Sequence, residues 1–96
     1  MEITLYGSIR TVMFILTEKG SGGVYAVSDT LDGQKIVQCF ELEDDANRYY
    51  DLLVADDYPD ELEIMEVAPE IIAMNCKSYG YKYTVISPND LVIPPL

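Results

Sequence analysis

Apolar residues in this 96-residue chain fall into short runs whose spacing changes along the sequence, and that change restricts the fold more than any other feature. Thr11 to Thr17 is a continuous apolar run, typical of a buried strand. Val24 to Ser28 and Gln34 to Phe40 are rich in β-branched and aromatic residues. The Asp32-Gly33 pair between them offers the positive φ that a hairpin loop requires. The sequence therefore predicts three strands, the last two paired antiparallel.

The spacing becomes helical after Phe40. Apolar residues recur at i, i+3, i+4, i+7 and i+8, at Ala46, Tyr49, Tyr50, Leu53 and Val54. Proline cannot extend a helix, so this one should end before Pro59. A fourth strand is expected over Leu62 to Val67. A second helix should follow, with Pro69 in its first turn and Gly80 just beyond its end. We expect four of its side chains to point inward: Ile71, Ile72, Cys76 and Tyr79.

With a last strand over Tyr81 to Ser87, the predicted order is βββαβαβ. This order indicates a single α+β domain over residues 11–96, built on one mostly antiparallel sheet. Right-handed crossovers lead us to expect both helices on one face, in the style of a ferredoxin-like fold. Residues 1–10 are interpreted as an N-terminal extension or a short extra strand. No apolar run approaches the roughly 20 residues of a membrane-crossing helix, so no membrane span is expected.

Charge is distributed unevenly along the chain. The formal net charge is −11, and twelve of the 17 acidic residues lie between Glu41 and Glu70, where Arg48 is the one base. The flanking segments carry five acids and five bases and cancel. Such a concentrated negative field favours a protein partner with a basic surface. It disfavours nucleic acid and anionic lipid, which require clustered Lys and Arg.

The residues that commonly carry catalysis are scarce. Histidine is absent, which removes the most frequent general base and zinc ligand. Cys39 and Cys76 lie in apolar contexts and are expected to be inert packing thiols rather than a redox pair. The acidic segment lacks the calcium-binding loop pattern, so we predict no metal and no cofactor. We therefore expect a protein that is not an enzyme.

The favoured hypothesis is an interaction module that docks the first helix and the loop after it on a basic surface. Tyr50 and Tyr58 are the preferred anchors, because Tyr is favoured where a side chain is partly buried and partly meets a partner. The complete set of predicted interaction residues is Asp44, Asp45, Tyr50, Asp56, Asp57, Tyr58, Asp60 and Glu61.

The sequence also fits two other functions. The alternative is a regulatory domain that binds a small metabolite, with a pocket near Gly20 to Gly23. Mimicry of nucleic acid by the acidic face is a further possibility.

Several ordered motifs resemble a known family. The stretch from Val37 to Tyr49 runs from a strand ending in Phe40 into an acidic Asp-Asp-Ala-Asn-Arg-Tyr helix start. It is followed by Asp57-Tyr58-Pro59, Cys76, Gly80-Tyr81 and Pro94-Pro95. This pattern, from about Val12 to Pro95, resembles the small cyanobacterial and plastid proteins of domain-of-unknown-function family 3110. The resemblance implies a cytoplasmic or plastid stromal setting, peripheral to thylakoid complexes, and a role as an accessory or assembly subunit of a photosynthetic complex. It supplies no catalytic or ligand residues.

Overall fold

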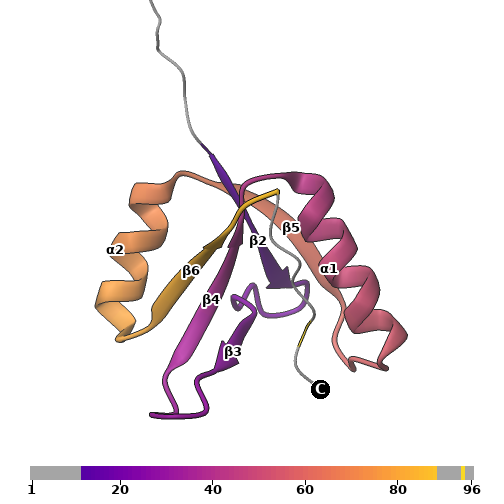
Figure 1. Ribbon diagram of the computed structural model, residues 1–96, viewed down its shortest axis with the longest axis horizontal. Coiled ribbons are helices and arrows are strands. Elements are labelled where there is room, and N and C mark those ends of the chain that lie inside the picture. Colours follow the sequence, from indigo (N-terminus) through magenta and orange to yellow (C-terminus); the bar gives the residue numbers. More distant parts are fainter. Residues whose placement is uncertain (1–11, 89–93, 95–96) are drawn as a thin grey trace, which may run out of the picture.

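Five strands that form one sheet and two helices make up the computed structural model, which describes residues 12–88 and 94 (Figure 1). The elements are β2 (Met13–Glu18), β3 (Ala26–Ser28), β4 (Lys35–Phe40), α1 (Glu43–Ala55), β5 (Leu62–Val67), α2 (Pro69–Tyr79) and β6 (Lys82–Ile86). The βββαβαβ order, the α+β class and the mostly antiparallel sheet are confirmed. The expected strand or extension at residues 1–10 lies outside the described residues, and the division at residue 11 stays a prediction.

Strand β4 is the centre of the sheet. One of its edges pairs with β6 in parallel, from Ile36 with Lys82 to Phe40 with Ile86. Its other edge pairs antiparallel with β3 and then, where Phe14 meets Phe40, with β2. Strand β5 continues the sheet on the far side of β2. Among the described strands, β3, β5 and β6 therefore each pair with a single neighbour, and β5 and β6 lie at the two sides of the sheet.

Two tight turns connect the first three strands as the glycine positions predict. Gly33 has φ 75° and donates its N–H to the Asp29 carbonyl at 2.9 Å, which closes the β3–β4 hairpin. Gly22 also has φ 75° and donates to the Glu18 carbonyl at 2.8 Å in the turn after β2. This turn brings Val24 back beside Thr17. The glycine-rich turn over residues 20–23 thus lies at the end of β2 and leads the chain back along that strand.

The two helices pack on opposite faces of the sheet. Successive strand residues point to opposite faces, and the core divides accordingly. Leu16 and Phe40 pack with α1, whereas Ile15 and Cys39 pack with α2. Figure 1 shows α1 and α2 separated by the strands. The prediction that both helices share one face, as in a ferredoxin-like fold, is wrong.

The direction of the two crossovers explains this difference. From β4, the chain passes through α1 and over β2 to reach β5 at one edge. From β5 it returns through α2 across the whole sheet to β6 at the other edge. Crossovers of the same hand place their helices on one face only when they progress in the same direction. Here they progress in opposite directions, so the helices lie on opposite faces.

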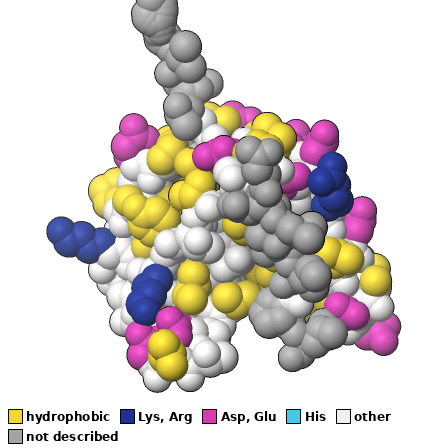
Figure 2. Space-filling view, in the orientation of Figure 1, with side chains coloured by type: hydrophobic (Ala, Val, Ile, Leu, Met, Phe, Trp, Pro, Cys, Tyr) yellow, Lys and Arg dark blue, Asp and Glu magenta, His cyan; other side chains and the backbone are white. Residues whose placement is uncertain are grey.

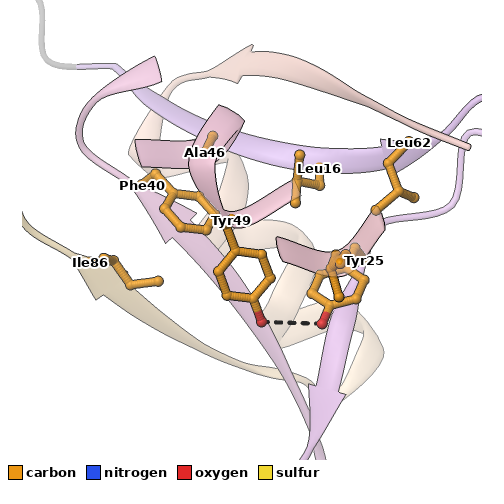
Figure 3. Packing of buried hydrophobic residues seen from close by; sticks show 8 residues of the cluster. Leu16, Tyr25, Phe40, Ala46, Tyr49, Leu62 and Ile86 are labelled. Atoms are coloured by element: carbon orange, nitrogen blue, oxygen red, sulfur yellow. Dashed lines mark hydrogen bonds between the residues drawn. The ribbon is translucent and has the colours of Figure 1, made fainter. Parts of the chain in front are cut away.

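The larger cluster lies beneath α1 and is rich in aromatic rings (Figure 3). Tyr49 of α1 makes edge-to-face contacts with Phe40 and Tyr25, with ring centroids 5.2 and 5.7 Å apart. Ala46 and Leu53, on the same stripe of the helix, are also buried. The apolar spacing in the sequence therefore identified the face of α1 that packs on the sheet.

Candidate functional site

Acidic side chains gather along α1 and the loop that follows it. We call this surface the acidic flank; its exposed members are Glu43, Asp44, Asp51, Asp56, Asp57, Asp60 and Glu61. On the face shown in Figure 2, acidic groups concentrate on the side where α1 lies, and apolar groups gather over α2. The structure thus brings most of the predicted acidic residues to one side of the molecule.

Few of these carboxylates form an ion pair with another described residue. Arg48 Nη1 lies 3.4 Å from Asp45 Oδ1, and Lys19 Nζ lies 3.9 Å from Glu61 Oε1. Asp45 differs from its neighbours, because its side chain is only 14% exposed and its Oδ2 is buried without a partner. Within residues 12–88, the other members of the flank form no ion pair. Most of the flank is therefore free to meet a cation from outside.

The C-terminal end of α1 carries acids where helix electrostatics disfavour them. The last turn has no basic residue, and Asp56 and Asp57 follow directly, beside the negative end of the helix dipole. Asp57 also adopts φ 63°, the left-handed conformation that glycine usually occupies after a helix. Tyr58 then donates its N–H to the Leu53 carbonyl at 3.0 Å and completes the capping motif. These carboxylates lie where they reduce local stability, and neither forms an ion pair within residues 12–88.

The two predicted tyrosine anchors are half-buried and engaged within the domain. The Tyr50 hydroxyl accepts a hydrogen bond from the Leu62 N–H at 3.2 Å, and the Tyr58 ring packs edge-to-face on Tyr25 at 5.7 Å. Burial raises the pKa of the Tyr58 hydroxyl, and nearby Asp60 adds to the effect. Both side chains hold the connection between α1 and β5 in place. Their role as interface anchors stays a prediction.

An apolar groove lies on the opposite face, beside α2. It has a volume of about 490 Å³ and is open to solvent. Its floor consists of sheet side chains, Ile15, Val37, Met65 and Val67. Its walls come from α2, from the residue before β6 and from the turn after β2: Gly22, Gly23, Val24, Ile71, Ile72, Asn75, Cys76, Tyr79 and Tyr81. The pocket expected near Gly20 to Gly23 under the metabolite hypothesis thus has a counterpart in the structure.

Helix α2 leaves part of its apolar surface uncovered along this groove. Of the four side chains expected to point inward, Ile72 and Cys76 are buried, but Ile71 is 44% exposed and Tyr79 is 73% exposed. The prediction is therefore wrong for Ile71 and Tyr79. Sequence periodicity identified the apolar stripe of the helix, but it could not show that the sheet beneath covers only part of that stripe.

The two cysteines lie in the cluster beneath α2 and are free thiols. Burial raises the pKa of Cys39 to about 12, and Cys76 nearby adds to the shift. Burial also raises the pKa of Cys76. Because the thiolate is the reactive form, both groups are poor nucleophiles at neutral pH.

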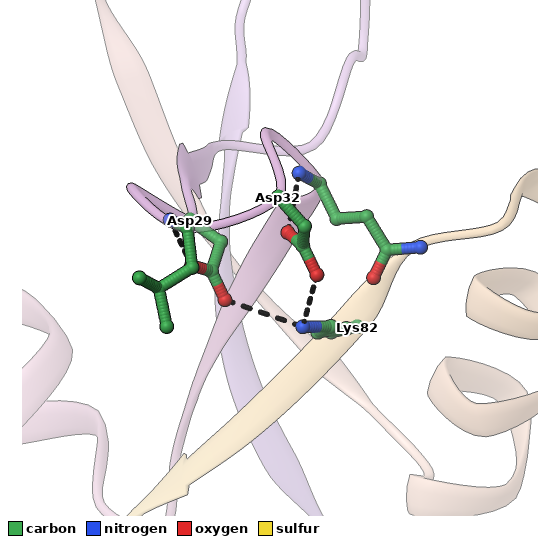
Figure 4. Close-up of polar contacts among 5 residues, drawn as sticks. Asp29, Asp32 and Lys82 are labelled. Carbon is green, nitrogen blue, oxygen red and sulfur yellow. Dashed lines mark hydrogen bonds and ion pairs between the residues drawn. The ribbon is translucent and has the colours of Figure 1, made fainter.

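A separate charged cluster ties β6 to the β3–β4 turn (Figure 4). Lys82 Nζ lies 3.2 Å from Asp29 Oδ2 and 2.8 Å from Asp32 Oδ2. Each carboxylate also accepts a backbone N–H, Asp29 from Leu31 and Asp32 from Gln34. Each of the three charged groups therefore has a partner of opposite charge. The role of the cluster is to hold the turn against β6. Among the described residues, no group of three or more Cys, Asp or Glu is arranged to hold a metal ion.

These features define a small α+β domain with an acidic flank on one side and an apolar groove on the other. The chain belongs to the family described as Domain of unknown function (DUF3110), whose model matches residues 11–96. This match confirms the resemblance that the sequence motifs indicated. No curated protein matches the sequence significantly.

A solved structure described as Anabaena Tic22 (protein transport) has a similar fold, with a TM-score of 0.57 and 13% sequence identity. The similarity covers 97% of this chain and 45% of that one, so the present chain spans less than half of the other protein. At this identity the likeness concerns the fold alone. No helix in the described part of the chain is both long and apolar enough to cross a bilayer.

Proposed function

We propose that this protein is a non-enzymatic interaction domain that docks its acidic flank on a basic surface of a larger protein assembly. The carboxylates at the C-terminal end of α1 are the observation that carries this proposal. Asp56 and Asp57 disfavour the helix end, and Asp57 occupies a left-handed conformation, yet neither forms an ion pair within residues 12–88. Residues that reduce stability, and that no internal contact offsets, are expected where a surface serves binding.

The physical role of the flank would be to accelerate encounter and to orient the partner. Complementary charge raises association rates and aligns the two surfaces, while short-range burial supplies most of the affinity. The similar structure is described as a protein of protein transport, which is compatible with an interaction role for this fold. The lineage that the family resemblance implies makes a photosynthetic complex, reached from the cytoplasm or the plastid stroma, our proposed assembly.

The test is capture from an extract of the source organism at rising ionic strength. The variant D56K/D60K reverses two exposed charges of the flank, and E41K/E66K reverses two exposed acids outside it as a matched control. We expect binding of the native domain and of the control to fall steeply with salt, and D56K/D60K to lose capture at low salt. The proposal would be contradicted if the amount of captured partner changed neither with ionic strength nor in D56K/D60K.

Metabolite binding is the second candidate function, and the groove is the observation that favours it. Gly22 and Gly23 line a hollow of about 490 Å³, within the usual size range of small-molecule sites. A thermal shift with an apolar metabolite, unchanged in D56K/D60K, would support this function. It would place the functional site on the α2 face instead of the flank.

A further inference from the structure

In the described part of the chain, no helix covers one half of the sheet face beneath α2. Helix α2 contacts chiefly β6, whereas α1 on the other face contacts β2, β4 and β5. On the α2 face, the side chains of Ile15 from β2 and of Met65 and Val67 from β5 therefore form the floor of an open groove. A sheet face of this kind is normally covered by a second element that completes the layer.

The uncovered side chains are large and apolar. Met65 in the floor of the groove is 50% exposed, Ile71 in its wall is 44% exposed, and Tyr79 extends the surface along α2. Contiguous exposed apolar surface in a soluble domain marks a site of interaction. Methionine suits such a surface, because its flexible thioether adapts to partners of different shape.

The polar groups of the lining favour a protein segment over a compact metabolite. Sites for small molecules place several convergent polar groups around the ligand. Among the described residues of the lining, Asn75 is the one amide or charged side chain, and the other polar groups are the tyrosine hydroxyls and the Cys76 thiol. An amphipathic helix requires only an apolar groove, and it would pack next to α2 at the usual separation of about 8–10 Å.

Charge at the edges of the groove selects a basic helix. Glu63 lies on the same face of β5 as Met65, two residues away, and Glu70 precedes Ile71 in the first turn of α2. Glu18, whose Oε1 accepts a hydrogen bond from the Ser21 hydroxyl at 2.8 Å, lies near Gly23 of the groove wall. Two cations also lie on this side of the sheet: Lys35, near Tyr81, and Lys77, in the last turn of α2.

We infer that the groove binds an amphipathic helix of a partner protein, with apolar residues against Met65 and Ile71 and with Lys or Arg facing Glu63 and Glu70. This inference rests on the proposed function, since it names the segment of the basic partner that the domain recognises. It also adds a second contact surface, distinct from the acidic flank.

A synthetic peptide tests the inference directly. The probe is a helix of about 18 residues, five turns, with Leu on one face and Lys and Arg on the other. A peptide of the same composition, shuffled to remove the apolar face, is the control for charge alone. Fluorescence anisotropy at moderate salt would measure both affinities for the full chain.

Two matched variants locate the binding surface. M65E places a charge in the groove, and V54E places the same charge on α1, where Val54 is 54% exposed. Both positions are exposed, so both variants should fold, which circular dichroism would verify. We expect M65E to weaken binding of the amphipathic peptide at least about tenfold, and V54E to leave it within about twofold.

Each alternative outcome overturns the inference in a recognisable way. Both peptides could bind equally, and D56K/D60K but not M65E could abolish that binding. This result would show that the peptides bind the acidic flank and not the groove. Binding of neither peptide, together with salt-independent capture, would remove both proposals. A dimer of the native chain that M65E dissociates would assign the groove to a second copy. Peptide binding that appears only after deletion of residues 1–10 would assign it to the chain's own N-terminal segment.

Discussion

The hydroxyl groups of Tyr25 and Tyr49 lie 3.1 Å apart and share a hydrogen bond inside the cluster beneath α1 (Figure 3). Tyr49 is almost fully buried, and its ring contacts both Tyr25 and Phe40. A buried hydroxyl that loses its partner retains its desolvation cost. We therefore expect Y49F and Y25F each to lower the free energy of unfolding by about 1–2 kcal/mol, measured by urea denaturation.

The double variant Y25F/Y49F separates this hydrogen bond from the packing of the rings. With both hydroxyls absent, no polar group is left unpaired, so the loss should be clearly smaller than the sum of the two single losses. Additive losses would show that the two hydroxyls contribute independently and that the shared bond does not couple them.

The stability of the domain at alkaline pH should depend on Tyr49. Burial raises the pKa of Tyr49 in the folded state, and the hydrogen bond with Tyr25 adds to the shift. The unfolded chain ionises Tyr near pH 10, so the stability linked to Tyr49 is complete below that pH and is lost as the pH rises toward the folded-state pKa. Urea denaturation from about pH 8 to 11 should show this decline in the native protein and a weaker decline in Y49F.

Replacement of Asp57 by glycine should stabilise the domain. Asp57 holds φ 63°, which costs an L-residue more than glycine, and its carboxylate lies at the negative end of α1. We expect D57G to raise the free energy of unfolding by about 0.5–1 kcal/mol.

The control for D57G is D56G, which removes the same charge from a residue with φ −97°. Glycine offers no conformational advantage there and increases the entropy of the unfolded chain, so D56G should not stabilise comparably. Equal effects of the two changes would trace the gain to charge and not to backbone conformation.

The fold and the site differ in how far local sequence determines them. The strands and helices followed from periodicity, and Gly33 and Gly80 occupy the positive φ positions expected of them. The placement of α2 did not follow, because it depends on the order of β5 and β6 across the sheet. The groove exists where α2 leaves Met65 and Ile71 uncovered. For the same reason, the sequence predicted its position near the glycine turn but not the residues that line it.

The acidic residues show a similar limit. Their number and segment were evident in the sequence, and the exposure of Asp56, Asp57 and Asp60 follows from the helix end. The inward engagement of Tyr50 and Tyr58 was not evident, since a Tyr beside a helix end can cover either the core or a partner. Only tertiary contacts decide between those two positions.

Removal of the Lys82 amine should change the titration of two aspartates to different extents. The Leu31 N–H and then Lys82 lower the pKa of Asp29, whereas Lys82 has the largest effect on the lowered pKa of Asp32. In K82M, carboxyl titration by NMR should show the Asp32 pKa returning toward its ordinary value, with that of Asp29 staying lower. K35M removes the same charge from an exposed Lys and should leave both titrations unchanged.

This cluster also sets a pH dependence whose sign is fixed. Because the folded-state pKa values of Asp29 and Asp32 are lowered, the stability they contribute is present above their unfolded pKa and is lost as pH falls through the folded values. K82M should therefore flatten the decline of the thermal midpoint below about pH 4. An unchanged acid profile in K82M would assign that decline to other carboxylates.

Thiol labelling connects the buried cysteines with the groove. Cys76 lines the groove, whereas Cys39 lies deeper, and burial raises the pKa of both thiols. At pH 8 the native protein should react with an alkylating reagent far more slowly than the unfolded chain, and mass spectrometry should locate the first adduct on Cys76. Faster labelling of Cys39 would contradict this order, because it would require the cluster beneath α2 to open more readily than the groove. A helix seated beside α2 should slow labelling of Cys76 further, whereas binding confined to the acidic flank, on the opposite face of the sheet, should leave its rate unchanged.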